Sequence, residues 1–435
     1  MLKRKIMFSL IEWKKNRNKK CLVVQGARQV GKTYAIREFS KNNYTELLEI
    51  NFKETPSAKE IFSGDLNVNA ILTALKFRYP QKRIKPEHTL IFFDEIQECP
   101  EAITSLKFWT LDNRFDVITS GSLLGIDYKR ASSYPVGYVE YIKMHGLDFE
   151  EFLWATNIND EMINILHQNF ISRKKIPESI HTVMMTKLRE YIALGGMPEV
   201  VQEYINSNDF TKADKIQRQI LMGYQYDIAH YASSEEKVKA EKCYLSLGKQ
   251  LLDKENQKFQ YKEVEHGGKA QKFFSSIEWL LRADIINLCS SVSTPCYDLT
   301  DYTKDNIFRA YTTDLSLLIA MKDFGLKQHI IENSLIANTK GGIYECFIAD
   351  VLTKKDLPMY FYKNDTTKKE IDFITQKNGI IIPIEVKSAN SKATSLKWLM
   401  ENNKSIPTAY KFIDGNIGIG ENNTITMPLY MAIFL

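Results

Sequence analysis

The stretch GARQVGKT, residues 26–33, decides the fold of the first part of this chain. It follows the apolar run 21–24 and has the spacing G-x-x-x-x-G-K-[ST]. We expect a buried strand, a glycine-rich turn and a helix that begins at Lys32. Backbone N–H groups of such a turn, together with the helix N-terminus, bind polyphosphates. The predicted phosphate-binding residues are Gly26, Ala27, Arg28, Gln29, Val30, Gly31, Lys32 and Thr33.

Two side chains of this loop have distinct expected roles. The ammonium of Lys32 reaches the β and γ phosphates, and the hydroxyl of Thr33 is a ligand of Mg²⁺. The sequence therefore predicts ATP and Mg²⁺ as ligands of the N-terminal part. The alternative explanation is an ordinary loop that contains glycine.

A second segment, HTLIFFDEIQ at residues 88–97, supports this interpretation. Its apolar run 90–93 is typical of a central parallel strand that is covered on both faces. The strand ends in Asp94, which we expect to hold Mg²⁺, and Glu95, which we expect to activate the attacking water as a general base. The alternative is a strand that merely ends in two acidic residues.

A third expected strand, residues 115–118, is followed by Thr119, Ser120, Gly121 and Ser122. Because the carboxyl ends of parallel strands meet at one edge of a sheet, Ser120 or Thr119 should lie beside the acidic pair and sense the γ-phosphate.

Arg114 and Arg130 are candidates for an arginine finger that reaches the nucleotide of a neighbouring subunit. The alternative is that both are solvated surface side chains.

Composition bounds the class of protein. The chain is 44% hydrophobic and 26% charged, which is typical of folded domains. Its 435 residues are too many for a single hydrophobic core. A net charge of +5 permits contact with nucleic acid without requiring it. The six cysteines show no C-x-x-C pair, which indicates buried thiols in a reducing compartment. With no apolar stretch long enough to span a bilayer, we expect a cytoplasmic protein with no membrane partner.

Periodicity divides the chain into four expected parts. Residues 1–150 alternate strand and helix patterns, as in a doubly wound sheet, and residues 151–235 look helical. Residues 236–328 have the order of elements of a winged helix, and residues 329–435 are rich in β patterns. Between two helices, residues 195–198 read GGMP. This corner is either a plain helix–turn–helix connection or a lid corner that contacts the nucleotide base.

Near the C-terminus, Asn378 and Gly379 separate two β-rich segments, and Asn-Gly favours a two-residue type I′ hairpin turn. In that register paired residue numbers sum to 757, so Asp372 faces Glu385 and Glu370 faces Lys387. Alternation then places Asp372, Glu385 and Lys387 on one face.

Like charges directly opposite each other are unfavourable unless a cation lies between them. We therefore predict that Asp372 and Glu385 bind Mg²⁺, and that Lys387 stabilises charge on a scissile phosphate or orients the attacking water. The alternative is a surface hairpin in which Lys387 forms ion pairs with Glu370 and Glu385.

In combination, these segments resemble a family of prokaryotic ATP-binding proteins with an AAA-type P-loop domain. The family's C-terminal domain, formerly of unknown function, resembles PD-(D/E)XK nucleases. The resemblance covers nearly the whole chain, and its marks are GARQVGKT (26–33), LIFFDEIQ (90–97), GS (121–122), PVGYVE (135–140), FEEFL (149–153), GGMP (195–198), FRAY (308–311), EIDF (370–373) and PIEVK (383–387).

The resemblance implies an α/β fold: a parallel AAA-type P-loop sheet, a helical lid, a winged-helix-like module and a C-terminal α/β domain of the restriction-endonuclease type. It also implies two site residues. Glu345 is the helical acidic residue that faces Asp372 and Glu385, and Pro198 lies near the nucleotide.

From the sequence we hypothesise an ATPase that uses nucleotide binding and hydrolysis to reposition a metal-dependent nuclease-like domain that acts on DNA. The alternative is a nucleotide-controlled switch or scaffold that binds a protein or DNA partner, with a catalytically silent C-terminal domain. Whether the chain forms a homo-oligomer is left open.

Overall fold

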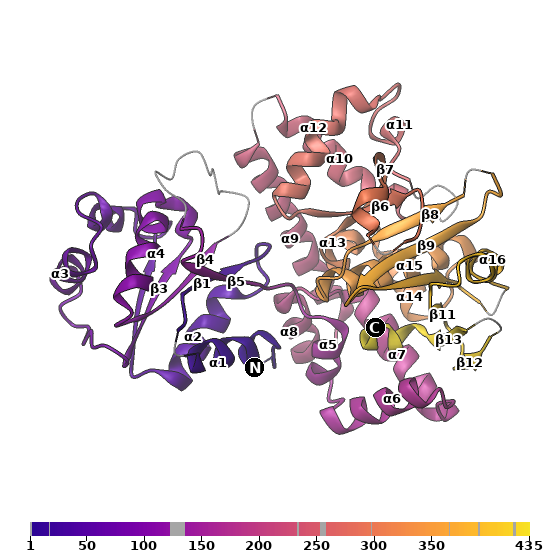
Figure 1. The fold of residues 1–435 in the computed structure, drawn as a ribbon, viewed down its shortest axis with the longest axis horizontal. Helices are drawn as coiled ribbons and strands as arrows, with labels where there is room; N and C mark the ends of the chain where they lie inside the picture. Colours follow the sequence, from indigo (N-terminus) through magenta and orange to yellow (C-terminus); the bar gives the residue numbers. More distant parts are fainter. Residues whose placement is uncertain are drawn as a thin grey trace. The chain divides into compact units, whose positions relative to one another are not determined.

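The computed structural model describes residues 2–16, 18–121, 135–232, 235–252, 258–296, 298–364, 366–389, 392–420 and 423–435. These residues form two compact units (Figure 1). The smaller unit comprises residues 4–145 and 282–284, and the larger unit comprises the rest of the described chain.

Within the described part of the smaller unit, five strands form one sheet in the order β2-β3-β4-β1-β5, and all neighbouring strands are parallel. β4 therefore lies between the strand that precedes the glycine-rich loop and the strand that ends in the acidic pair. The elements are α1 (Ile6–Lys15), β1 (Cys21–Gln25), α2 (Lys32–Asn43), β2 (Glu46–Asn51), η1 (Pro56–Phe62), α3 (Val68–Arg78), β3 (Thr89–Asp94), η2 (Ile96–Glu98), α4 (Pro100–Asp112), β4 (Asp116–Gly121) and β5 (Val139–Lys143).

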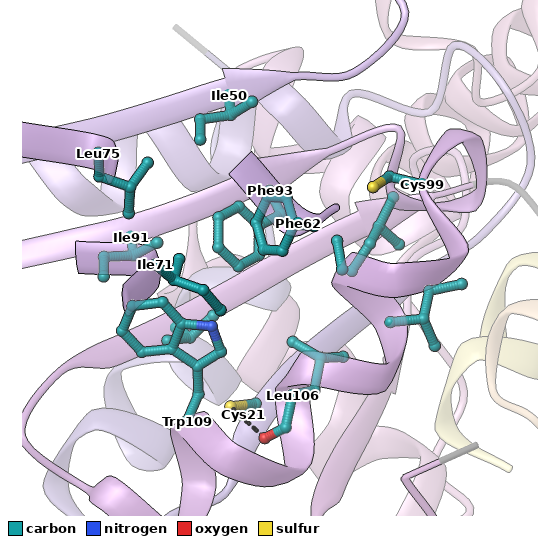
Figure 2. Close-up of a cluster of buried hydrophobic side chains, with 14 of the residues drawn as sticks. Cys21, Ile50, Phe62, Ile71, Leu75, Ile91, Phe93, Cys99, Leu106 and Trp109 are labelled. Atoms are coloured by element: carbon teal, nitrogen blue, oxygen red, sulfur yellow. Dashed lines mark hydrogen bonds between the residues drawn. The ribbon is translucent and has the colours of Figure 1, made fainter. Parts of the chain in front are cut away.

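Both faces of this sheet are covered. Figure 2 shows one face, where β-strand residues such as Cys21 and Phe93 pack with Trp109 of α4 in one apolar cluster. Leu22 and Val24 point to the opposite face and are also fully buried, and α2 packs against β2, β3 and β4. A parallel sheet with two buried faces confirms the α/β architecture predicted for this part of the chain.

In the described residues of the larger unit, an eight-stranded mixed sheet has the order β12-β13-β11-β10-β9-β8-β6-β7. No helix in the described ranges is long and apolar enough to cross a membrane. The elements are α5 (Phe149–Ala155), α6 (Asp160–Ser172), α7 (Glu178–Leu194), α8 (Pro198–Ser207), α9 (Phe210–Tyr231), α10 (Lys237–Gln250), α11 (Tyr261–Val264), α12 (Ala270–Arg282), β6 (Ile286–Val292), η5 (Leu299–Tyr302), β7 (Thr303–Thr312), α13 (Leu315–Ala320), α14 (Phe324–Ile331), α15 (Ala337–Lys354), β8 (Tyr360–Lys363), β9 (Glu370–Lys377), β10 (Ile380–Val386), α16 (Thr394–Asn402), β11 (Ala409–Ile413), β12 (Gly418–Ile419), β13 (Thr424–Pro428) and η6 (Leu429–Phe434).

The predicted division between residues 328 and 329 cuts through this sheet. β6 and β7 pair with each other, as the hairpin of a winged helix would, but β6 also pairs in parallel with β8 of the C-terminal part. The two regions that the sequence suggests as separate domains therefore share one sheet. Backbone pairing between segments this far apart leaves no local pattern in the sequence.

The C-terminal hairpin forms in the predicted register. Asn378 and Gly379 connect β9 to β10, both with positive φ, and the paired residue numbers sum to 757. The ladder between β9 and β10 ends at Phe373 and Ile384, one residue short of the predicted pair of Asp372 with Glu385.

A bulge in β9 accompanies the end of this ladder. Between Ile371 and Ile374, β9 advances three residues while its other neighbour, β8, advances two. Such a bulge disrupts pairing locally and re-aims side chains. Asp372 lies in it, and its carboxylate accepts a hydrogen bond of 2.7 Å from the backbone N–H of Val386. Direct strand pairing is thus replaced here by a contact between side chain and backbone.

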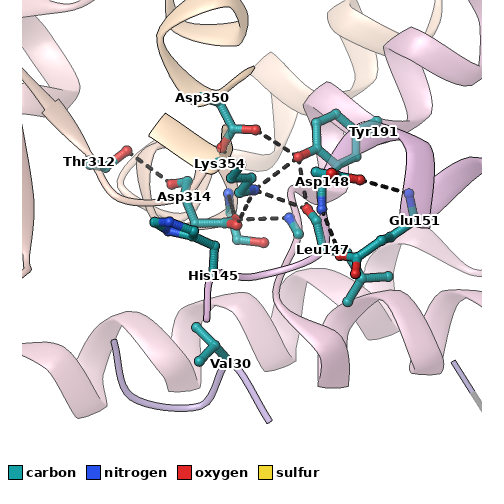
Figure 3. A network of polar contacts seen from close by, with 12 residues as sticks. Val30, His145, Leu147, Asp148, Glu151, Tyr191, Thr312, Asp314, Asp350 and Lys354 are labelled. Atoms are coloured by element: carbon teal, nitrogen blue, oxygen red, sulfur yellow. Dashed lines mark hydrogen bonds and ion pairs between the residues drawn. The ribbon is translucent and has the colours of Figure 1, made fainter. Parts of the chain in front are cut away.

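A buried lysine, Lys354 at the end of α15, connects distant segments of the larger unit (Figure 3). Its ammonium is 2.6 Å from Asp314, 2.9 Å from Asp350, 2.9 Å from the hydroxyl of Tyr191 and 3.0 Å from the carbonyl oxygen of Leu147. Burial alone would lower the pKa of Lys354, but the two carboxylates raise it above its ordinary value. The ammonium therefore stays charged and paired in the core.

The GGMP corner packs against this network. Gly196 N–H donates to Asp314 at 2.9 Å, and Gly195 has a φ of +70°. A Cβ atom at Gly195 would come within 2.1 Å of the backbone nitrogen of Ser316, and one at Gly196 within 2.1 Å of the carbonyl oxygen of Leu147. The two glycines are needed because other segments approach too closely for any side chain.

We expect Gly195→Ala to lower the free energy of unfolding of the larger unit by at least about 2 kcal/mol, because it adds both an unfavourable φ and a steric overlap. Gly379→Ala is the matched control. Its φ is also positive, +78°, but no atom lies within 4 Å of the added Cβ. Urea denaturation should give a loss of about 1 kcal/mol for the control. Equal losses in the two variants would contradict the role of close packing at Gly195.

Candidate functional site

The glycine-rich loop connects β1 to α2 with the backbone that the motif requires. Gly26 and Gly31 have φ values of +153° and +93°. A Cβ at Gly26 would lie 2.0 Å from the carbonyl oxygen of Met144, so only glycine fits there. Lys32 begins α2, which places the loop at a helix N-terminus, a favourable position for anions.

Lys32 is held inside its own loop. Its ammonium donates to the carbonyl oxygens of Gly26 and Ala27, at 2.8 and 2.7 Å. Burial lowers the pKa of Lys32 to about 8, although the negative charges of Glu95 and Asp94 act in the opposite direction. The loop carbonyls are neutral and therefore only partly compensate the charge of the ammonium. A bound phosphate group would supply the opposite charge.

Asp94, at the end of β3, is the centre of the site. Its side chain is 3% exposed and accepts hydrogen bonds from the hydroxyl of Thr33, at 3.0 Å, and from the hydroxyl of Ser120. The side-chain amide of Asn51 donates to it at 3.0 Å. The strand order explains this convergence, because β4 lies beside β3 and β1, and β2 is the other neighbour of β3.

Glu95 follows Asp94 in an unusual conformation. Its φ of +52° is rare for a residue with a side chain, and such strain is often found at functional sites. Its carboxylate accepts a hydrogen bond from the side-chain amide of Gln97. Gly121 makes room for that amide, because a Cβ there would lie 2.5 Å from Gln97 Oε1.

The structure distinguishes between the two candidates at the end of β4. Ser120 contacts Asp94, whereas the hydroxyl of Thr119 is buried without a hydrogen-bond partner. Arg114 pairs with Asp112 at 2.7 Å and precedes β4, so it lies at the edge of the sheet opposite to Ser120. Ser122 and Arg130 lie outside the described residues. An arginine finger stays a prediction.

Asn51 and Gln97 are the site residues that sequence reasoning missed. Asn51 is the last residue of β2, and Gln97 lies three residues beyond the end of β3. Gln97 is 8% exposed, which is unusual for an amide side chain. A polar residue at the carboxyl end of each predicted strand was the signal that could have found them.

A second group of predicted residues lies at β9 and β10 of the larger unit. Lys387 forms an ion pair with Glu385 at 2.5 Å. Burial would lower the pKa of Lys387, but Glu385, Asp372 and Glu345 together raise it above its ordinary value. The structure thus brings the three carboxylates and the lysine close enough to interact.

Arg309 of β7 was not predicted and changes this second group. Its guanidinium, which is almost fully buried, is 3.2 Å from Glu345 and 2.7 Å from Glu370. It also donates to the backbone carbonyl oxygen of Asp372 at 3.1 Å. The second cation that pairs with Glu370 is Lys363, at 2.9 Å. Glu370 therefore pairs with Arg309 and Lys363 in place of the Lys387 suggested by the hairpin register.

The side chains of the second group are engaged with one another and with protein donors. Across the described ranges, no cluster of three or more His, Cys, Asp or Glu side chains could hold a metal ion. Part of the reason is visible: an arginine neutralises Glu345, and Asp372 accepts from a backbone N–H. Metal binding by Asp372 and Glu385 stays a prediction.

Pro198 begins α8 in the larger unit, whereas the glycine-rich loop belongs to the smaller one. Its expected position near the nucleotide stays a prediction. What the structure shows at this corner is the packing of Gly195 and Gly196 described above.

Comparison with known families divides the chain into three matches. Residues 18–153 match the model of an AAA domain. Residues 185–328 and 340–430 match two domains of unknown function, DUF8612 and DUF4143. No curated protein sequence matches the chain. The smaller unit is therefore an AAA-type P-loop domain with a parallel α/β sheet.

Similarity to solved structures is distant. DnaA from Aquifex aeolicus bound to AMPPCP is 10% identical with a TM-score of 0.30, over 64% of this chain and 87% of that chain. ORC from Drosophila bound to DNA is 12% identical with a TM-score of 0.26, over 76% of this chain and 94% of that one. ORC1 from Aeropyrum pernix in complex with DNA is 11% identical with a TM-score of 0.26, over 76% of this chain and 91% of that chain.

The ion pair of Arg309 and Glu345 allows a double-mutant cycle. We expect Arg309→Met to lower the free energy of unfolding by about 3–5 kcal/mol, because it leaves buried carboxylates without their cation. The double variant Arg309→Met/Glu345→Gln should recover part of that loss, since one of those charges is then removed. Urea denaturation measures both. Strictly additive effects would show that the two side chains do not interact.

Proposed function

We propose that the AAA-type P-loop domain of residues 18–153 binds ATP together with Mg²⁺ and hydrolyses it. One observation carries the proposal. The buried carboxylate of Asp94 accepts hydrogen bonds from Thr33 of the loop and from Ser120 at the end of β4, and Glu95 follows it directly. Phosphate-binding, metal-binding and water-activating groups therefore meet at one edge of the sheet.

The residues present fit the magnesium ion that this chemistry requires. The Thr33 hydroxyl and the Asp94 carboxylate are hard oxygen donors held 3.0 Å apart, so these two residues would hold the ion. When bound, Mg²⁺ neutralises charge on the β and γ phosphates. Asn51 and Ser120 already orient the Asp94 carboxylate, which in turn holds the Thr33 hydroxyl, and this limits the reorganisation that binding requires.

Two other residues act on the substrate in this proposal. Lys32 gives up its hydrogen bonds to the loop carbonyl oxygens and places its positive charge beside the β and γ phosphates. Glu95 accepts a proton from the attacking water. Gln97 keeps the Glu95 carboxylate oriented by donating to it, so Gln97 acts as a positioning residue.

Measurement of ATP turnover in the full chain tests these roles. We expect Glu95→Gln to reduce turnover by a factor of about 10²–10⁴ while ATP still binds, because only the base is lost. Lys32→Ala should weaken ATP binding itself, because the loop loses its cation. Release of inorganic phosphate and calorimetry with ATP and Mg²⁺ separate the two effects.

Glu98→Gln is the matched control for this experiment. Glu98 belongs to the same short turn, and its carboxylate forms a long ion pair of 3.7 Å with Lys59. Turnover in this variant should equal that of the wild type. Equal turnover in wild type, Lys32→Ala and Glu95→Gln would remove the ATPase proposal.

For the larger unit we propose a role in binding, controlled by the nucleotide state of the P-loop domain, and not a role in cleavage. Arg309 argues against cleavage, because its guanidinium pairs with Glu345, the helical acidic residue that the family resemblance assigns to the nuclease site. The partner is then DNA or a protein. A winged-helix arrangement of residues 236–328 stays a prediction that is compatible with either.

Incubation with plasmid and oligonucleotide substrates in Mg²⁺ or Mn²⁺ distinguishes binding from cleavage. We expect no cleavage above the level of the Asp372→Ala and Lys387→Ala variants, because arginine already neutralises part of the carboxylate group. Metal-dependent cleavage by the wild type that both variants lose would establish nuclease activity. It would overturn the proposal that the larger unit binds without cleaving.

A further inference from the structure

A pocket of about 370 Å³ lies on the C-terminal sheet, beside the carboxylate and lysine group. The strand register connects the two places. Glu385 of β10 pairs with Lys411 of β11, which pairs with Thr426 of β13. Paired residues of neighbouring strands project to the same face of a sheet. Lys411 and Thr426 line the pocket, so it opens on the face that carries Glu385.

The lining is cationic. Lys392, Lys397 and Lys411 contribute side chains, and no acidic residue is among the described residues that line it. Thr394, the first residue of the nine-residue helix α16, also lines the pocket and adds the positive end of the helix dipole. Glu385, the carboxylate that is paired with Lys411 across the strands, already forms an ion pair with Lys387 at 2.5 Å. The local charge is therefore positive.

Thr424 is the second, independent observation. Its side chain lines the pocket and is only 8% exposed, and its hydroxyl has no hydrogen-bond partner. A buried hydroxyl without a partner costs free energy, and a ligand that accepts its hydrogen bond would remove that cost. Thr424 and Thr426 are two residues apart on β13 and share a face, which directs both side chains to the pocket.

Lys411 adds to the case for an anion. It is 9% exposed, and burial, together with the neighbouring charge of Lys387, lowers its pKa, while Glu385 acts in the opposite direction. A negatively charged ligand would add a favourable charge interaction to this ammonium.

We propose that this pocket binds a phosphate group, either free or as part of a nucleic-acid strand. Lys397 and Lys411 supply positive charge, the hydroxyl of Thr424 donates a hydrogen bond, and the first turn of α16 faces the anion. This deepens the proposed binding role of the larger unit and rests on it. It does not depend on ATP hydrolysis, which belongs to the smaller unit.

The test uses the full chain in a Lys32→Ala background, so that the P-loop contributes little to phosphate binding. The probes are inorganic phosphate and a fluorescein-labelled ten-nucleotide DNA strand. We expect Thr424→Val to weaken binding about 10- to 150-fold, the effect of one lost hydrogen bond to a charged group. Lys397→Gln should weaken it about threefold, as expected for an exposed charge.

Two control variants match these changes. Thr375→Val removes another buried hydroxyl without a partner, on β9 and outside the pocket, and Lys404→Gln removes an exposed lysine beyond the other end of α16. Both should bind like the background protein. Because the Thr424 hydroxyl has no partner, Thr424→Val should also keep or raise the melting temperature, which excludes misfolding as a cause of lost binding.

The outcomes are distinct. Displacement of the strand by millimolar phosphate supports recognition of the phosphate group alone, and binding of the strand without displacement supports recognition within a strand. Unchanged affinity in both Thr424→Val and Lys397→Gln would overturn the proposal that this pocket binds phosphate. Equal losses of affinity in all four variants would overturn it as well. ATP turnover of the wild type is measured in parallel, so failure of this inference is separate from failure of the ATPase proposal.

Discussion

The buried ammonium of Lys354 is the interaction on which the larger unit depends. It joins the end of α15 to Asp314 after β7, to Tyr191 of α7 and to the chain at Leu147. Removal of such a charge from water is unfavourable unless every partner is in place. The paired carboxylates, Asp314 and Asp350, therefore specify one arrangement of segments that are up to 207 residues apart. The same helix carries Glu345, so the network also orients the C-terminal carboxylate group.

Most of the smaller unit could be predicted because its chemistry is local. The glycine-rich loop, the acidic pair and Ser120 each follow a buried run, and in a parallel sheet the ends of such runs converge on one edge. Asn51 was missed because it belongs to no motif, and Gln97 because its motif, LIFFDEIQ, was interpreted only through its two acidic residues. Their roles come from which strand lies beside which, and single-sequence patterns do not determine strand order.

The C-terminal group shows the other limit. The hairpin register followed from one turn, Asn378 and Gly379, because a two-residue loop determines every pair that follows it. The bulge near Asp372 and the approach of Arg309 could not be derived in this way. Arg309 lies on β7, 63 residues before Asp372, and reaches it because both strands belong to one sheet. One cation from a distant strand thus gives the predicted metal site a partner that no local pattern indicates.

The shared sheet also has a consequence for inheritance by recombination. β8 lies between β6 and β9, so the segment of residues 340–430 would keep an unpaired strand edge and a buried Glu345 without its arginine if it were moved alone. Exposed edges promote association with other chains. A viable exchange between genes must carry β6 and β7 along with the C-terminal strands.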